Sequence, residues 1–172
     1  MNATSVQKLG GGIGAHAVWN RLGRLHLPAL YAPPMRQPQS REILYLEPSS
    51  LALRLKGERH LTLLESVMRQ EHLGRYSFLA CNPRHTLRVE QGVAVLDGER
   101  QMEPPLQLIS NLLAKHAQAH IAGLPPFQGG LAGYIGYEFG RSLEPQARIP
   151  GFAPICPDAV LHLYDTVAGF DH

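Results

Sequence analysis

The sequence predicts an α+β fold built from short, mostly antiparallel strands with one clear helix. Glycine and proline are frequent, with 17 and 14 of 172 residues, which favours many short elements joined by turns over a helical bundle. Several strand-like runs are separated by turn residues, and a single stretch has the apolar spacing of an amphipathic helix. A meander of strands with one helix is typical of the α+β class.

Five short runs are predicted as strands, at residues 43–46, 61–64, 75–80, 86–90 and 93–96. In the fourth run Leu87 and Val89 alternate with polar residues, so we expect them to share a buried face. Gln91-Gly92 then forms a tight hairpin turn into the fifth run. Two longer stretches, 131–139 and 160–170, are predicted as further strands.

The predicted helix begins at Pro104-Pro105, because proline is tolerated in a first helical turn. Gly123 and the two prolines after it are expected to end it. Its apolar residues recur at helical spacing, and the predicted buried stripe is Leu106, Ile109, Leu112, Leu113 and Ala117.

Length and charge restrict the class of protein. A chain of 172 residues can bury one core. Residues 1–41 contain five basic and no acidic side chains, whereas residues 42–172 contain 11 basic and 14 acidic ones. The main body therefore lacks the basic surface that nucleic-acid binding needs. No apolar run is long enough to span a membrane, and two cysteines do not make a disulfide framework, so we expect a cytoplasmic protein.

The first forty residues differ in kind, and we predict a flexible tail at 1–40 before a domain at 41–172. Glycines and then prolines are concentrated in the tail, and its acid-free composition fits a transit segment or an upstream start. A short amphipathic helix could span residues 15–27. Gly12-Ile13-Gly14 resembles the start of a dinucleotide-binding fingerprint, but no convincing strand precedes it, so nucleotide binding is not expected.

Metal and nucleophile chemistry find little support in the sequence. No cluster of histidine and cysteine has the spacing of a metal site, and we assign no metal ligand and no catalytic residue. His116 and His120 could share a helix face, but they lack a third ligand. Cys81 follows an apolar strand and is expected to be a buried small residue rather than a nucleophile.

Two segments favour function over packing alone. A strand ending in Glu65-Ser66, beside one beginning Arg75-Tyr76, gathers a hydroxyl, a guanidinium and an aromatic ring, which suit a zwitterionic ligand with an apolar side chain. The alternative is a salt bridge and a strand cap. The second segment, residues 125–137, alternates glycine with large residues, which indicates a bulge or the close approach of a ligand or another backbone. The alternative there is a tightly packed strand crossing.

Together these residues resemble the N-terminal region of component I of the chorismate-aminating synthases, which include anthranilate synthase and aminodeoxychorismate (para-aminobenzoate) synthase. The resemblance runs from about residue 42 to residue 172. It rests on Leu63-Leu64-Glu65-Ser66, on Gly74-Arg75-Tyr76-Ser77-Phe78 with Asn82-Pro83, on Pro126-Phe127-x-Gly-Gly-x-x-Gly-Tyr with Gly136-Tyr137, and on Leu163-Tyr164-Asp165-Thr166 with Phe170-Asp171-His172.

The resemblance implies a two-lobed α/β enzyme that converts chorismate with magnesium and with ammonia from a glutamine amidotransferase partner. Its magnesium ligands and its acid and base residues lie in a C-terminal lobe that residues 1–172 do not reach. We therefore expect no catalytic residue and no cofactor in this chain, which would be inactive alone, and magnesium only in the complete enzyme. A separate chain could supply the catalytic lobe.

The resemblance also implies part of an amino-acid pocket. In anthranilate synthases this pocket is the tryptophan feedback site, and in some aminodeoxychorismate synthases it holds a structural tryptophan. Ser66 matches the serine that contacts the ligand, and a second contacting segment corresponds to Leu73, Gly74, Arg75 and Tyr76. A third segment belongs to the other lobe.

The branch of the family stays open between two possibilities. Glu65-Ser66 with Arg75-Tyr76 is similar to a regulated anthranilate synthase of tryptophan biosynthesis. Residues 136–144 are more similar to aminodeoxychorismate synthase of folate biosynthesis. Of the two branches, the sequence favours aminodeoxychorismate synthase. The chain could also be a free-standing module that binds an aromatic amino acid, or an inactive fragment.

Overall fold

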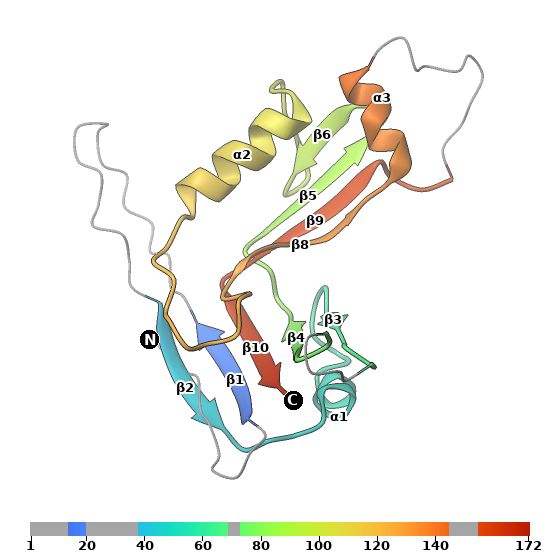
Figure 1. Ribbon diagram of the computed structural model, residues 1–172. Coiled ribbons are helices and arrows are strands. Elements are labelled where there is room, and N and C mark those ends of the chain that lie inside the picture. Colours follow the sequence, from blue (N-terminus) through green and yellow to red (C-terminus); the bar gives the residue numbers. More distant parts are fainter. Residues whose placement is uncertain (1–13, 20–37, 69–72, 145–154) are drawn as a thin grey trace. The chain divides into compact units, whose positions relative to one another are not determined.

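The computed structural model describes residues 14–19, 38–68, 73–144 and 155–172, and the chain divides into two compact units (Figure 1). Unit 1 takes its described residues from 1–83, 116–130 and 164–172, and unit 2 comprises those of 84–115 and 131–163. Each unit contains a five-stranded sheet. Strands with little helix confirm the predicted α+β class.

The sheet of unit 1 has the strand order β2-β1-β10-β4-β3. Its members are β1 (Gly14–Trp19), β2 (Gln39–Ile43), β3 (Thr62–Leu64), β4 (Tyr76–Ala80) and β10 (Thr166–Asp171), and each neighbouring pair is antiparallel. Leu79 and Phe170 are buried at its centre. Helix α1 (Pro48–Arg54) packs its Leu51 and Ala52 against them. The predictions for β3 and β4 are therefore confirmed.

The N-terminal part of this sheet corrects two predictions. Residues 14–19, expected in a flexible tail or a short helix, form strand β1 between β2 and β10. Residues 39 and 40, also assigned to the tail, begin β2. The hydrogen-bond partners of β1 are distant in sequence, with Val18 opposite Val167, and such pairing overrides local propensity. Apart from residue 38, which precedes β2, the rest of the predicted tail lies outside the described residues.

Helix α1 was also missed. The run at 43–46 was expected to be a strand that stops at Pro48, but β2 ends at Ile43 and Pro48 begins the helix. Proline suits a first helical turn, since it lacks only an N–H that has no partner there. Pro48 thus marks the end of the apolar run as predicted, and it also begins helix α1, which was not predicted.

A buried tyrosine ties β3 to the junction that leads into β10. The Tyr164 hydroxyl accepts a hydrogen bond from Thr62 Oγ1 at 2.7 Å and donates one to the carbonyl oxygen of His60 at 2.5 Å. Its side chain is almost fully buried, and this burial raises the pKa of the phenol. These bonds hold β3, which carries the predicted binding segment, against the sheet.

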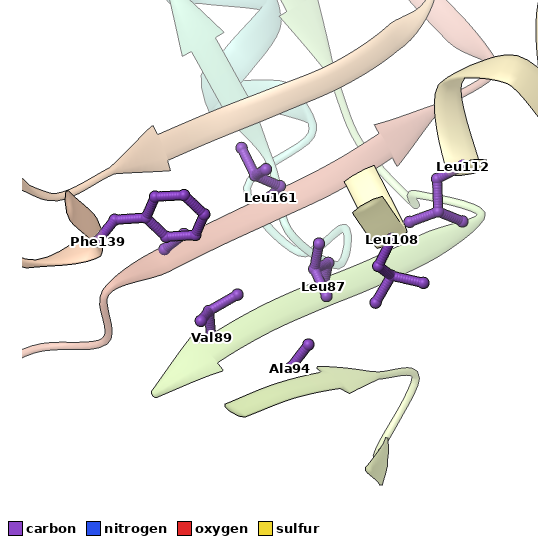
Figure 2. Close-up of a cluster of buried hydrophobic side chains, with 8 residues drawn as sticks. Leu87, Val89, Ala94, Leu108, Leu112, Phe139 and Leu161 are labelled. Atoms are coloured by element: carbon purple, nitrogen blue, oxygen red, sulfur yellow. The ribbon is translucent and has the colours of Figure 1, made fainter. Parts of the chain in front are cut away.

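The sheet of unit 2 has the order β7-β6-β5-β9-β8. It consists of β5 (His85–Glu90), β6 (Val93–Leu96), β7 (Glu99–Arg100), β8 (Gly130–Ile135) and β9 (Ala159–Tyr164). The first residue of β8 and the last residue of β9 are assigned to unit 1. Leu87 and Val89 are buried on one face as predicted, and β5 and β6 form the predicted hairpin. Figure 2 shows these side chains converging with those of helix α2 (Pro105–Lys115).

Helix α2 is confirmed, but its buried face and its end differ from the prediction. Of the predicted stripe, Leu112 enters the core and Ile109 packs against it, whereas Leu106 and Leu113 are 44% and 45% exposed. Leu108, which was not predicted, is buried instead. The helix ends at Lys115 instead of near Gly123, and the next residue, His116, already belongs to unit 1. Among the described residues no helix is long and apolar enough to cross a membrane.

The two long predicted strands are each divided. The stretch at 131–139 forms most of β8 and then the short helix η1 (Tyr137–Phe139), in which Phe139 is buried, and helix α3 (Gly140–Leu143) follows it. The stretch at 160–170 forms β9 and β10, which belong to different sheets and are separated by Asp165 alone. A strand that changes sheet reads as one continuous apolar run in the sequence.

The turn after β6 is held by a carboxylate. Asp97 accepts hydrogen bonds from the Thr86 N–H at 2.8 Å and from His85 Nδ1 at 2.6 Å. Partial burial would raise the pKa of Asp97, but the hydrogen bonds from His85 and Thr86 outweigh it and hold this pKa below its usual value. The ionised form is therefore more stable in the folded chain than in the unfolded one.

Acid should remove the stabilisation that the ionised Asp97 side chain gives to the fold. A carboxyl with a lowered pKa stabilises the fold above its unfolded pKa of about 4, and the contribution is lost as the pH falls below that value. We expect the free energy of unfolding of Asp97→Asn to fall less between about pH 5 and pH 3 than that of the wild type. Chemical denaturation at each pH measures this, with the exposed Glu99→Gln as control. Equal pH profiles for the wild type and Asp97→Asn would contradict the assignment.

Candidate functional site

The predicted binding residues meet where β3 ends and β4 begins, within unit 1. Strands β3 and β4 are antiparallel with Leu64 opposite Phe78, so the segment after β3 lies beside the first residues of β4. Ser66 Oγ donates a hydrogen bond to the carbonyl oxygen of Tyr76 at 2.7 Å, and the Ser66 N–H donates one to Ser77 Oγ at 3.0 Å. Ser66 and Tyr76 are thus brought together, and Ser66 is held from both its backbone and its side chain.

Gly74 makes this close approach possible. Its φ is +77°, in the left-handed region that favours glycine. A Cβ atom at this position would lie 1.9 Å from the carbonyl oxygen of Met68. The backbone of 73–75 therefore passes against the segment after β3 without room for any side chain at residue 74.

Arg75 is engaged by a carboxylate of the neighbouring strand. Its Nε and Nη2 atoms donate to the two oxygens of Asp171, the last residue of β10, at 2.6 and 2.7 Å. The guanidinium also lies over the Tyr76 ring, with Cζ 4.9 Å from the ring centroid. This arrangement raises the pKa of Arg75, because the hydrogen bond and the attraction of Asp171 favour the charged form. Arg75 thus forms a salt bridge, as in the alternative for this segment, but its partner Asp171 lies in β10, outside the two predicted segments.

Apolar side chains at the same end of the sheet are open to solvent. Leu73 is 65% exposed and Val67 is 88% exposed, and Leu64 and Met68 are exposed as well. Glu65 also faces solvent. A hydroxyl, a guanidinium paired with Asp171 and exposed apolar side chains thus occur together at this end of the sheet.

Three residues of this cluster were not singled out by sequence reasoning. Ser77 is fully buried, and its Oγ lies 2.7 Å from Nε2 of His172. The His172 N–H donates to the carbonyl oxygen of Arg75 at 2.8 Å. Ser77, Asp171 and His172 all occur in the family motifs, but nothing in the sequence says that β10 lies beside β4.

The glycine-rich segment behaves in part as a close strand crossing. In unit 2, a Cβ atom on Gly133 would lie 2.1 Å from the carbonyl oxygen of Val160 in β9. The expected close approach of another backbone is thus confirmed at this glycine, and the approaching group is a strand.

The residues of this motif that belong to unit 1 brace a loop. Gln128 is buried, accepts the Ile121 N–H at 2.9 Å and donates to the Ile121 carbonyl at 2.8 Å. The ring of Phe127 meets that of Phe78 edge to face, with centroids 5.7 Å apart. This contact joins the loop to β4 near the binding segment.

A metal site is not formed by the part of the chain that the structure describes, because no three histidine, cysteine, aspartate or glutamate side chains there are grouped to hold an ion. His120 lies 3.0 Å from Nε2 of Gln128 and belongs to the loop brace. Cys81 is half-buried, and burial raises the pKa of its thiol, which opposes the thiolate that a nucleophile would need.

Comparison with known proteins identifies relatives of this chain. Anthranilate synthase component 1 of Pseudomonas putida is 36% identical over 133 residues, which are 73% of this chain and 27% of the relative. The protein of the same name from Saccharomyces cerevisiae is 33% identical, over 64% of this chain and 21% of its own length. A crystal structure of anthranilate synthase component I from Streptococcus pneumoniae matches with a TM-score of 0.50 and 31% identity, over 74% of this chain and 27% of that chain.

This chain is related to the N-terminal region of component I of the chorismate-aminating synthases. It spans about a quarter of the length of these component I relatives. No family model matches the sequence. The resemblance read from the four motifs is thereby confirmed at the level of the family.

Proposed function

We propose that this chain is the non-catalytic N-terminal lobe of a component I of the anthranilate synthase type, and that it carries part of a tryptophan pocket. The observation that carries the proposal is the junction of β3 and β4, where Ser66 is fixed against Tyr76 beside Gly74 and Arg75. The comparisons support the tryptophan branch, since the relatives from Pseudomonas putida and Saccharomyces cerevisiae are named anthranilate synthase component 1.

In this proposal the ligand's polar groups meet Ser66, and its indole covers the apolar side chains. The Ser66 proton is donated to the Tyr76 carbonyl, so the hydroxyl oxygen retains lone pairs that can accept a hydrogen bond from an ammonium group. Leu73 is exposed and offers an apolar surface to an aromatic ring. The remaining contacts would come from the other part of component I, so the isolated chain should bind weakly.

The folate branch remains the second candidate. Residues 136–144 favour it, with a Gly-Arg pair after the tyrosine segment. These residues include η1 and α3 of unit 2, whereas the predicted binding residues belong to unit 1. The two branches make different products from chorismate, so the product of the completed enzyme distinguishes them.

The complete enzyme would need partners that act outside this chain. We propose that ammonia comes from a glutamine amidotransferase subunit and that magnesium binds in the part of component I beyond these residues. We assign no step of the reaction to the described residues. Their proposed role is to bind the amino acid and to stabilise the complete protein.

Product formation tests this proposal. The 172-residue chain, given chorismate, magnesium and ammonia, is expected to form neither anthranilate nor aminodeoxychorismate. Mixed with the remaining region of the Pseudomonas putida component 1, it should support the formation of anthranilate, which fluorescence detects. Product from the chain alone, or no anthranilate from the mixture, would contradict the proposed role.

The proposed pocket has its own test. Ser66→Ala removes one hydrogen bond to a charged ligand, worth about 1.5 kcal/mol or more, so tryptophan should bind the reconstituted protein about tenfold more weakly. Calorimetric titration measures the affinities, with Ser50→Ala in helix α1 as a matched control that should bind as the wild type does. Equal affinities for wild type and Ser66→Ala would show that the serine is structural.

A further inference from the structure

The Arg75–Asp171 ion pair does more than cap a strand. Arginine is the side chain best suited to hold a ligand's carboxylate, because its planar guanidinium offers parallel N–H donors. Here the edge formed by Nε and Nη2 is already occupied by both oxygens of Asp171. The protein thus supplies its own carboxylate at the position where an anionic ligand would bind.

The backbone fixes this pairing. Strands β10 and β4 are antiparallel with Asp171 opposite Tyr76, the residue after Arg75. The His172 N–H donates to the Arg75 carbonyl at 2.8 Å, which holds the chain on both sides of the pair. The Tyr76 ring lies under the guanidinium and limits its reorientation. A free carboxylate would therefore compete with one that the sheet holds in place.

The cancelled charges of Arg75 and Asp171 also weaken the attraction of this site for a ligand's carboxylate. The side chains of Arg75 and Asp171 are 60% and 27% exposed, so the pair lies at the surface where a ligand would approach. Their charges sum to zero, so the three N–H donors that Asp171 does not use belong to a neutralised pair. Ser66 cannot replace Arg75 as a carboxylate donor, since its proton is donated to the Tyr76 carbonyl.

We propose that Asp171 is a specificity-determining residue of this site: by occupying Arg75 it removes the anchor for a ligand's carboxylate, so binding depends on the ammonium group that Ser66 accepts, and aromatic acids that lack this group are rejected. The inference rests on the proposed amino-acid pocket and adds a residue to it. Asp171 acts through Arg75 and need not touch the ligand. The site would then select amino acids over the corresponding carboxylic acids.

The test uses indole-3-propionate, which is tryptophan without its amino group. Ligand-observed NMR titration of the 172-residue chain detects weak binding of both ligands. Asp171→Asn frees the guanidinium, and we expect it to bind indole-3-propionate about fivefold more tightly than the wild type, the upper range for an exposed ion pair. Arg75→Gln/Asp171→Asn should lose this gain, and Asp171→Glu, which keeps the charge, should not show it.

Each outcome decides between the claims. Unchanged affinity for indole-3-propionate in Asp171→Asn, with tryptophan still bound by the wild type, overturns the role of Asp171 alone. A gain that persists in the double variant also overturns it, because the effect would not pass through Arg75. No tryptophan binding by the wild type overturns the pocket itself and this inference with it. Asp171→Ser replaces Asp171→Asn if circular dichroism shows that the latter does not fold.

Discussion

Gly74→Ala is expected to abolish detectable tryptophan binding and to destabilise unit 1. The added Cβ would lie 1.9 Å from the Met68 carbonyl oxygen, and the contact is with backbone, so no side-chain rotation relieves it. The segment of 73–75 must then move away from the segment after β3, which separates Ser66 from Tyr76. The positive φ of 77° adds about 1 kcal/mol or more of strain. NMR titration and thermal unfolding measure the two effects.

Gly123→Ala is the matched control for this variant. Gly123 has a similar φ of +82° in the same unit, but nothing lies within 4 Å of a Cβ built there. It should lose stability through backbone strain alone and retain the binding of the wild type. If Gly74→Ala binds tryptophan as Gly123→Ala does, the close approach at residue 74 is not needed by the site.

Gly133→Ala is expected to have the largest effect on stability. Its Cβ would lie 2.1 Å from the Val160 carbonyl oxygen and close to further backbone of β9, and its φ is +148°. Strain of this kind costs about 1–3 kcal/mol before the clash is counted, so we expect a loss of at least about 3 kcal/mol and the separation of β8 from β9. Chemical denaturation measures the loss, and hydrogen exchange shows whether β9 loses protection.

Gly98→Ala measures the backbone strain alone, so its difference from Gly133→Ala gives the steric part of the effect. Gly98 lies in the turn after β6 with a φ of +88° and nothing within 4 Å of a built Cβ. We expect it to lose only about 1–2 kcal/mol, the cost of the left-handed conformation for a residue with a side chain. Similar losses in the two variants would show that β8 can move away from β9 at little cost.

Local patterns predicted the elements that depend on near neighbours. The hairpin of β5 and β6 was correct because alternating Leu87 and Val89 are followed by Gln91-Gly92, and both signals act within a few residues. Helix α2 was correct for the same reason. Its buried face was correct at Leu112 and Ile109 but wrong at Leu106, since Leu106 and Leu108 are both apolar and only the sheet decides which one is covered.

Long-range pairing accounts for what the sequence did not predict. Strand β1 carries few of the branched residues that favour strands, and it is paired with the distant residues of β10 as well as with β2. The predictions for the binding segment divide in the same way between local motifs and long-range pairing. Ser66, Gly74 and Tyr76 were identified from their motifs, whereas Asp171 and His172 became part of the cluster only when β10 was seen beside β4.

The measurement that tests the central claim most directly is the mapping of tryptophan onto this chain by amide chemical shifts. In the ¹⁵N-labelled wild type, millimolar L-tryptophan should shift the signals of Ser66, Gly74, Arg75 and Tyr76 in unit 1, whereas L-alanine at the same concentration should not. The strands of unit 2 should remain unchanged. Shifts confined to unit 2, or none at millimolar tryptophan, would contradict the proposal that the junction of β3 and β4 is an amino-acid site.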